Sequence, residues 1–261
     1  MTTIRPAAVA GQFYPDDADE LQAQLGEFLA AVHASGARPK AIIAPHAGYV
    51  YSGPVAASVY ARVQPYANEI TRVILLGPSH RVRLRGLAAP SVDFFATPLG
   101  DIAIDHSALR LLTDFPFVAV SDQAHAQEHS LEVQLPFLQA ILAEFTLVPL
   151  VVGEATAQEV AQVLERLWGG AETLIVISSD LSHYHDYATA QRLDAATSQA
   201  IEQLRFEDLN YDSACGLNPV SGLLYIARQR GLHARAIDVR NSGDTAGPRD
   251  QVVGYGAYVI N

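Results

Sequence analysis

Residues 41–53, AIIAPHAGYVYSG, are the stretch that decides the fold of this chain. They predict a short apolar strand, a Pro-His-Ala-Gly turn and the start of a helix rich in small residues. Further along, residues 72–80, RVILLGPSH, repeat the pattern of a buried strand that ends in a turn with one histidine. Ligands of open α/β sheets bind at the carboxyl ends of parallel strands. We therefore expect His46 and His80 to lie side by side on that edge of a sheet.

The composition is that of a globular protein with a large core. The 261 residues are 49% hydrophobic and 17% charged. The sequence contains no apolar run of about eighteen residues that would span a membrane and no apolar stretch typical of a signal peptide, so we expect a cytoplasmic protein without a membrane partner. The formal charge of −11 argues against nucleic-acid binding, which depends on Lys and Arg that neutralise phosphates. A single cysteine, Cys215, excludes a disulfide within the chain.

The order of apolar stretches, and of the Gly and Pro residues that interrupt them, predicts one α/β domain over residues 1–261. Residues 41–80 indicate strand, helix (54–63) and strand, an order typical of a right-handed parallel unit. Residues 86–105 are broken by Pro and Gly into short alternating stretches, which favour antiparallel hairpins at an edge of the same sheet. Further helices are expected over residues 16–33, 107–114, 130–142 (kinked at Pro136), 156–168, 189–204 and 219–229, and further strands over 117–120, 145–152, 172–179, 234–239 and 252–260. We predict a mostly parallel mixed sheet with helices on both faces.

Polar side chains gather where the expected strands end or the helices begin. Imidazoles suit iron, copper, nickel or zinc, and two histidines with one carboxylate and open positions are typical of non-haem Fe(II) oxygenases. Each residue also has an ordinary interpretation, such as a hydrogen-bonded turn, a helix cap or a solvated loop. The residues that could meet on one face are His46, His80, Glu128, His129, Asp180, His183, His185 and Asp244.

Other chemistries find less support in the sequence. It contains no G-x-S-x-G nucleophile elbow, and no P-loop, dinucleotide-binding glycine fingerprint or HExxH helix. Cys215, in SACGLNP, precedes an expected helix, where a thiol can have a lowered pKa. Because no partner for this thiol is evident, we expect it to be structural.

Seven motifs in the same order closely resemble the Memo family, the bacterial AmmeMemoRadiSam system protein B group. They are RPAAVAGQFYP, APHAGYVYSG, VILLGPSH, EHSLEVQLPFL, ISSDLSHY, ACGLNP and the SGD…VVGYGAYV tail. The resemblance covers the chain from Arg5 to Asn261. It implies a LigB-like fold, that of class III extradiol dioxygenases.

The resemblance also implies a metal site. His46 and His80 match the family's metal-binding histidines. Animal Memo proteins are expected to use a cysteine in the tail loop, where this chain has Thr245, a poor ligand for a soft metal, directly after Asp244. We therefore predict that Asp244 is the third ligand, with Asp180 or His183 as the alternative, and that the metal is Fe(II), with copper or zinc as other candidates.

The activity implied by the resemblance is extradiol cleavage of a catechol-type substrate by O2. His183 is expected to move the proton of the second catechol hydroxyl, since the pKa of histidine lies near neutrality. His129 is expected to hydrogen-bond bound oxygen or substrate. The substrate pocket is expected to include Tyr49, Tyr184, Asp180 and Glu128.

Two other functions use the same residues. The first is a non-catalytic iron- or copper-binding interaction or redox protein, which would act with the AMMECR-like and radical SAM proteins that the system name implies. The second is a hydrolase in which zinc activates water.

Overall fold

The core of the protein is a nine-stranded mixed sheet, seen in the computed structural model, which describes residues 2–33 and 35–261. The strands of this sheet are β2 (Ala41–Ala44), β3 (Arg72–Pro78), β4 (Leu87–Ala89), β7 (Val118–Val120), β8 (Thr146–Val152), β9 (Thr173–Ser178), β10 (His183–His185), β11 (Ala234–Asn241) and β12 (Val252–Ile260). Their order is β10-β12-β2-β9-β3-β8-β4-β7, and β11 pairs with β12. Strands β2, β9, β3 and β8 are mutually parallel, whereas β12 and β4 run antiparallel to their neighbours in this group.

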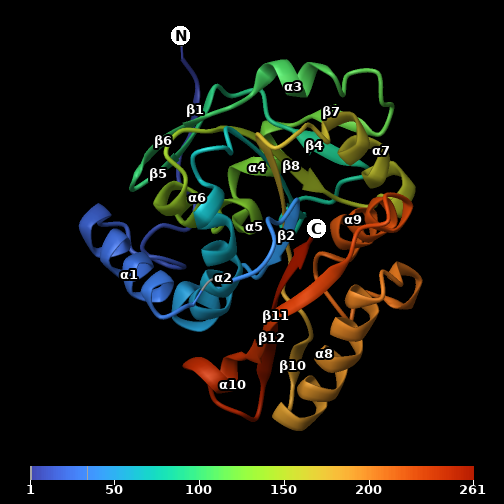
Figure 1. The fold of residues 1–261 in the computed structure, drawn as a ribbon. Helices are drawn as coiled ribbons and strands as arrows, with labels where there is room; N and C mark the ends of the chain where they lie inside the picture. The colour runs from blue at the N-terminus through green and yellow to red at the C-terminus, as the bar shows by residue number, and fades with distance from the viewer. Residues whose placement is uncertain (1, 34) are drawn as a thin grey trace.

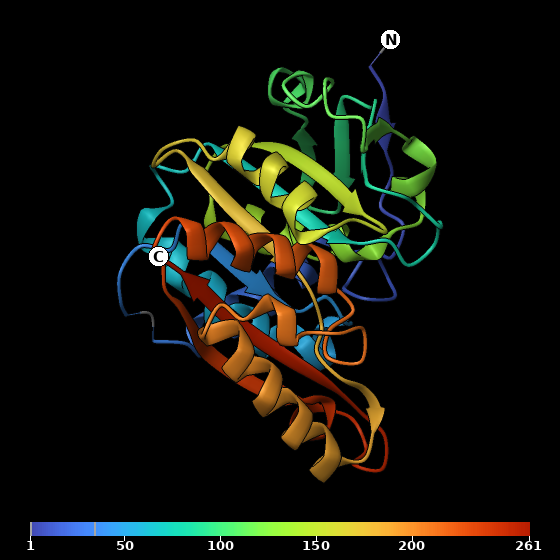
Figure 2. The ribbon, with the colours of Figure 1, turned by 90° about the vertical axis from the view of Figure 1, so that its right-hand side faces the viewer.

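Helices cover both faces of this sheet (Figures 1 and 2). One layer contains α1 (Ala18–Ala30), α2 (Tyr49–Val63), α5 (His129–Glu132) and α6 (Leu135–Ile141), and the opposite layer contains α7 (Ala157–Leu167), α8 (Tyr187–Glu202) and α9 (Leu217–Gln229). The short helices α3 (His106–Arg110), α4 (Asp122–Ala126) and α10 (Ser242–Thr245) and the 3-10 turns η1 (Gln64–Tyr66) and η2 (Phe206–Asp208) lie in connections. The predicted α/β domain, with a mixed sheet between helices, is confirmed. No helix in the described part of the chain has the length and apolarity to cross a membrane.

The buried strands are rich in apolar residues because both of their faces are covered. Every residue of β9 and β2 is buried, and β3 is buried from its second residue onward. Their side chains belong to one continuous hydrophobic core that also includes the inner faces of α2, α7 and α9. This core holds the carboxyl ends of the parallel strands in place.

Three local predictions need correction. The hairpin β5 (Phe94–Thr97) and β6 (Gly100–Ala103) does not extend the main sheet, because β1 (Ile4–Arg5) pairs with β5 and makes a separate three-stranded sheet. The helix expected over residues 130–142 is divided into α5 and α6, with Pro136 in the first turn of α6. Helix α2 begins at Tyr49, so that Pro54 lies inside it.

The strand order places three polar residues at one edge of the sheet. His46 follows the end of β2, Asp180 follows the end of β9, and His80 follows the end of β3. Strand β9 lies between β2 and β3, so the two histidine-bearing strands are not direct neighbours. All three strands point the same way, and their carboxyl ends therefore meet at one edge.

Thr156 caps the N-terminus of α7, and replacement of its side chain is expected to destabilise the protein. Its hydroxyl accepts a hydrogen bond from the backbone N–H of Glu159, whose carboxylate accepts from the backbone N–H of Thr156 in return. Replacement by alanine is expected to cost about 1 kcal/mol of unfolding free energy, because the backbone N–H of Glu159 loses its acceptor. Urea unfolding of Thr156→Ala measures the loss, and Thr156→Ser is the matched control. Equal stability of the alanine and wild-type proteins would show that this cap contributes nothing.

Candidate metal centre

His46 is held in one orientation by groups at the ends of β2 and β9. Its side chain is buried, its backbone N–H donates to Asp180 Oδ1 at 2.7 Å, and its ring Nδ1 lies 2.8 Å from Ser178 Oγ. The Ser178 hydroxyl donates to the carbonyl of Ser130 at 2.6 Å and lies 2.9 Å from the Gln134 side-chain nitrogen. A hydroxyl has one proton to donate.

The tautomer of His46 follows from these contacts. Ser178 uses its proton on the Ser130 carbonyl, so the hydroxyl can only accept from His46 and from Gln134. Gln134 presents its NH2 group there because the same nitrogen lies 2.9 Å from the Pro45 carbonyl. Nδ1 of His46 therefore carries the proton, and Nε2 has a free lone pair. Burial lowers the pKa of His46 well below its ordinary value, so the ring is neutral at pH 7.

His80 is oriented by Glu128, which precedes α5. The Glu128 carboxylate lies 2.8 Å from Nδ1 of His80, and it also accepts the backbone N–H groups of His80 and of Ser130, at 2.5 Å and 3.0 Å. Burial raises the pKa of Glu128, but these hydrogen bonds outweigh burial and lower it to about 2. The carboxylate is ionised at neutral pH and can only accept, so Nδ1 of His80 carries a proton. Nε2 of His80 is free for a ligand.

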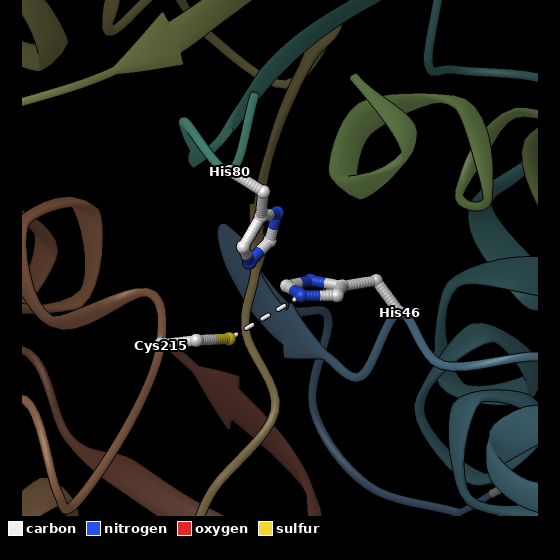
Figure 3. A group of neighbouring side chains, drawn as sticks. All are labelled: His46, His80 and Cys215. Atoms are coloured by element: carbon white, nitrogen blue, oxygen red, sulfur yellow. Dashed lines mark hydrogen bonds between the residues drawn. The ribbon is translucent and has the colours of Figure 1, made fainter. Parts of the chain in front are cut away.

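Cys215 lies where the two free nitrogens meet, as Figure 3 shows. Its Sγ atom is 3.3 Å from His46 Nε2 and accepts the backbone N–H of Asp180 at 3.3 Å. Gly216 lets the start of α9 approach the end of β9, since a Cβ at this position would lie 2.6 Å from Ser179 Cβ. Burial, followed by the nearby Asp180 charge, raises the pKa of the Cys215 thiol, so the thiol keeps its proton until a cation replaces it.

These three residues have the chemistry and spacing of a metal centre. The ligand atoms of His46, His80 and Cys215 all lie within 4.8 Å of one another. A cation that bonds imidazole nitrogen at about 2.0 Å and thiolate sulfur at about 2.3 Å holds these atoms within about 4.3 Å of one another, so only small side-chain movements are needed to close this group around an ion. Each imidazole turns Nε2 toward the centre and donates its Nδ1–H to an oxygen, which is how metal-ligating histidines are held in proteins. The residues therefore fit a metal bound by two imidazole nitrogens and one sulfur.

His129 packs against both ligand rings. Its ring centroid lies 4.7 Å from that of His80 and 5.5 Å from that of His46. Burial and the neighbouring His80 lower the pKa of His129 to about 4, so its ring is neutral at pH 7. Among the described residues its buried Nδ1 has no hydrogen-bond partner, and the nearest carboxylate oxygen, on Glu128, is 3.5 Å away. His129 is thus a neutral imidazole beside the candidate centre with one nitrogen available.

His183 and Asp180 lie close to the centre but do not join the ligand group. His183 begins β10, and burial lowers its pKa. Asp180 is buried, and burial raises its pKa to about 7 against the opposing effect of the N–H groups of His46 and Ala47. One carboxylate oxygen of Asp180 accepts the backbone N–H of His46, so Asp180 fixes the turn that carries His46.

Asp244 does not meet the two histidines, which corrects the predicted third ligand. It is exposed and lies in α10. The described residues contain two candidate clusters of metal-ligating side chains, His46-His80-Cys215 and His80-Glu128-His129, and Asp244 belongs to neither. One carboxylate oxygen accepts the backbone N–H of Asn241 at 3.0 Å, and the other accepts the hydroxyl of Tyr187. Asp244 completes the cap of its short helix, and the side chain that lies beside both His46 and His80 is the Cys215 thiol.

The residues predicted to line a substrate pocket have different surroundings. Tyr49 is buried in the core and donates to the Val133 carbonyl at 2.8 Å, so it is a packing residue. Tyr184 is 71% exposed, with a φ of 60°, in the left-handed region. Glu128 is 1% exposed and orients His80. His185 lies at the end of β10, outside both candidate clusters.

Comparison with known proteins agrees with the motifs quoted above. A family model described as Memo-like protein matches residues 5–259. The chain belongs to the Memo family. A MEMO1 family protein from Aquifex aeolicus is 36% identical, with 97% of each chain covered. One from Aeropyrum pernix is 37% identical and covers 98% of this chain and 99% of the relative. An uncharacterized protein from Escherichia coli K12, of known crystal structure, aligns with a TM-score of 0.48 and 13% identity over 85% of this chain and 100% of that one.

In this Memo family member, Glu128→Gln is expected to weaken metal binding about 10- to 100-fold, as loss of an oriented outer partner does in other metal sites. The amide offers one acceptor oxygen where the carboxylate receives three donors.

The pKa of Glu128 is lower in the folded protein, about 2, than its ordinary 4.5. Its contribution to stability is therefore complete above pH 4.5 and is lost as the pH falls toward 2. Acid unfolding should be less steep in Glu128→Gln over that range, and an unchanged profile with unchanged metal affinity would contradict this role.

Proposed function

We propose that this Memo family member binds one transition-metal ion through Nε2 of His46, Nε2 of His80 and Sγ of Cys215. The observation that carries the proposal is the convergence of Nε2 of two imidazoles, each held through Nδ1 by an oxygen, with one thiol at the carboxyl edge of the sheet. The thiolate suits copper(I) or zinc, and the imidazoles suit copper, zinc or iron. Three protein ligands leave a further position for a small molecule. The site thus has the composition of a reactive metal centre.

Access to this centre supports binding of a small ligand. A cavity of about 210 Å³ reaches Cys215 and is lined in part by Ser79, Arg83 and Tyr211. Sites for drug-sized ligands occupy roughly 300–1,000 Å³, so this space suits a small molecule. His80 keeps 29% of its side chain exposed, whereas His46 is 2% exposed. The cavity lining includes Cys215 but neither histidine, so a ligand in it would approach the metal from the side of Cys215.

The test of metal binding is a titration of chelator-treated protein, under anaerobic conditions, with copper(I), iron(II) and zinc in turn. The proposal predicts that at least one of these ions binds with one ion per chain and that His46→Ala abolishes this binding. His106→Ala is the matched control, since its ring contacts Asp93 and lies outside both candidate clusters. Failure of all three ions to bind, or equal binding by His46→Ala, would overturn the proposal.

A second candidate function is ring-cleaving dioxygenation of a catechol-type substrate. The observation that favours it is the neutral His129 ring, with one unpartnered nitrogen among the described residues, beside both histidine ligands. An iron(II) ion in the centre would supply electron transfer between a catechol and O2. His129 would hydrogen-bond the substrate oxygens, and His183 would accept and return a proton.

The dioxygenase proposal is tested with iron(II)-loaded protein and a panel of catechols. Ring cleavage appears as a yellow product whose formation requires O2 and iron and is lost in His183→Ala. Metal binding without turnover across the panel would overturn this second candidate. It would leave a metal-binding protein that acts through partners, for which AMMECR-like and radical SAM proteins are the proposed classes.

A further inference from the structure

The buried carboxylate of Glu132, in α5, binds the N-terminal segment, residues 5–14, through hydrogen bonds. It is fully buried and accepts four hydrogen bonds from that segment. The donors are Arg5 Nη1 at 2.7 Å, Ala8 N at 2.8 Å, Val9 N at 2.9 Å and the Tyr14 hydroxyl at 2.6 Å. A buried carboxylate needs such a complete set of donors to remain charged. Residues 5–14 are therefore fixed to the helix that follows Glu128.

Arg5 connects this carboxylate to the loop that carries Glu128. It is 4% exposed, and its Nε and Nη2 donate to the backbone carbonyls of His125 and Glu128, at 2.6 Å and 2.8 Å. Its Nη1 donates to Glu132 at the same time. The planar guanidinium holds its donors in a rigid fork, so the three acceptors are fixed relative to one another. Arg5 thus sets the backbone position of Glu128.

Phe13 brings the same segment into contact with the candidate centre. Its ring centroid lies 4.8 Å from that of His129, and its carbonyl accepts the backbone N–H of Tyr49 at 2.7 Å. Tyr49 begins α2, directly after the turn that carries His46. Residues 5–14 therefore touch the elements that present His46, Glu128 and His129.

We propose that Arg5 and Glu132 are positioning residues of the metal centre. They fix the backbone of Glu128, and Glu128 in turn holds Nδ1 and the backbone N–H of His80, so that Nε2 of His80 faces His46 and Cys215. This inference rests on the proposed metal site. It gives a role to the N-terminal motif RPAAVAGQFYP, which supplies none of the ligands.

The test compares Arg5→Met and Arg5→Lys with the wild-type protein. Both variants are expected to bind the metal about 10- to 100-fold more weakly, with lysine the milder change, since outer partners of metal ligands contribute on that scale. Lysine keeps the charge but not the fork that reaches three acceptors. If Arg5→Met does not fold, Arg5→Lys decides the question.

A second measurement does not depend on the metal. In metal-free protein with 15N-labelled histidine, the wild-type His80 ring is expected to be a single tautomer protonated at Nδ1, and both Arg5 variants are expected to shift it toward a mixture of tautomers. Arg72→Met, which breaks an ion pair with Asp105 away from the centre, is the matched control and should leave the ring unchanged. If wild-type protein binds no metal, the proposed function fails, and the tautomer still decides the positioning role. A folded Arg5→Lys with an unchanged His80 tautomer would overturn the inference, as would unchanged metal affinity.

Discussion

Cys215→Ser is expected to weaken metal binding by more than about 100-fold, because removal of a direct ligand should cost more than removal of the outer partners that orient ligands. Serine has nearly the shape of cysteine, but its hydroxyl is a poor ligand for a soft cation and does not ionise at neutral pH. The affinity is measured by competition with a coloured chelator. With cobalt(II) as a spectroscopic substitute, the sulfur-to-metal charge-transfer band should disappear.

Asp244→Ala is the matched control for this result. Asp244 caps α10 and lies in neither candidate cluster, so its replacement should change the affinity less than about threefold, well below the effect of an outer partner. If Asp244→Ala abolished binding and Cys215→Ser did not, the carboxylate would be the third ligand. The assignment of Cys215 would then be wrong.

Glu132→Ala is expected to lower the free energy of unfolding by about 3–5 kcal/mol, the cost of breaking a buried ion pair on one side. The substitution leaves the Arg5 charge buried and removes the acceptor of Ala8 N, Val9 N and the Tyr14 hydroxyl. Unfolding in urea measures the loss.

Glu207→Ala provides the comparison for Glu132→Ala. Glu207 pairs with Arg228 at 2.7 Å, but both side chains are about half exposed. Exposed ion pairs contribute roughly 0–1 kcal/mol, so this variant should be close to the wild type in stability. A Glu132→Ala protein that is no less stable than Glu207→Ala would show that the buried cluster does not anchor residues 5–14.

Much of the fold could be predicted from the sequence because its strands are short, apolar and separated by clear helix signals. Residues 41–44 and 73–78 are buried on both faces, so a continuous apolar run marks them. Because ligands of open α/β sheets bind at the carboxyl ends of parallel strands, His46 and His80 could then be placed at one edge of the sheet. The position of β9 between their strands was not predictable, because the order of strands in a sheet depends on packing and not on the local pattern of residues.

Cys215, the proposed third ligand, could not be predicted for a related reason. Cys215 and His46 are 169 positions apart in the chain, and no periodic pattern links them. Cys215 stood in a recognised motif, ACGLNP, and Gly216 was the local sign of a close approach between α9 and β9. Asp244 was favoured because a carboxylate completes a familiar ligand set, but the turn after β11 directs its carboxylate to Asn241 and Tyr187.

The most direct measurement of the central claim is the X-ray absorption spectrum of the metal-loaded protein. The account predicts one sulfur ligand at about 2.3 Å and two imidazole nitrogens at about 2.0 Å from the metal. It also predicts that the sulfur contribution disappears in Cys215→Ser. A wild-type spectrum with nitrogen and oxygen ligands and no sulfur would contradict the proposed centre.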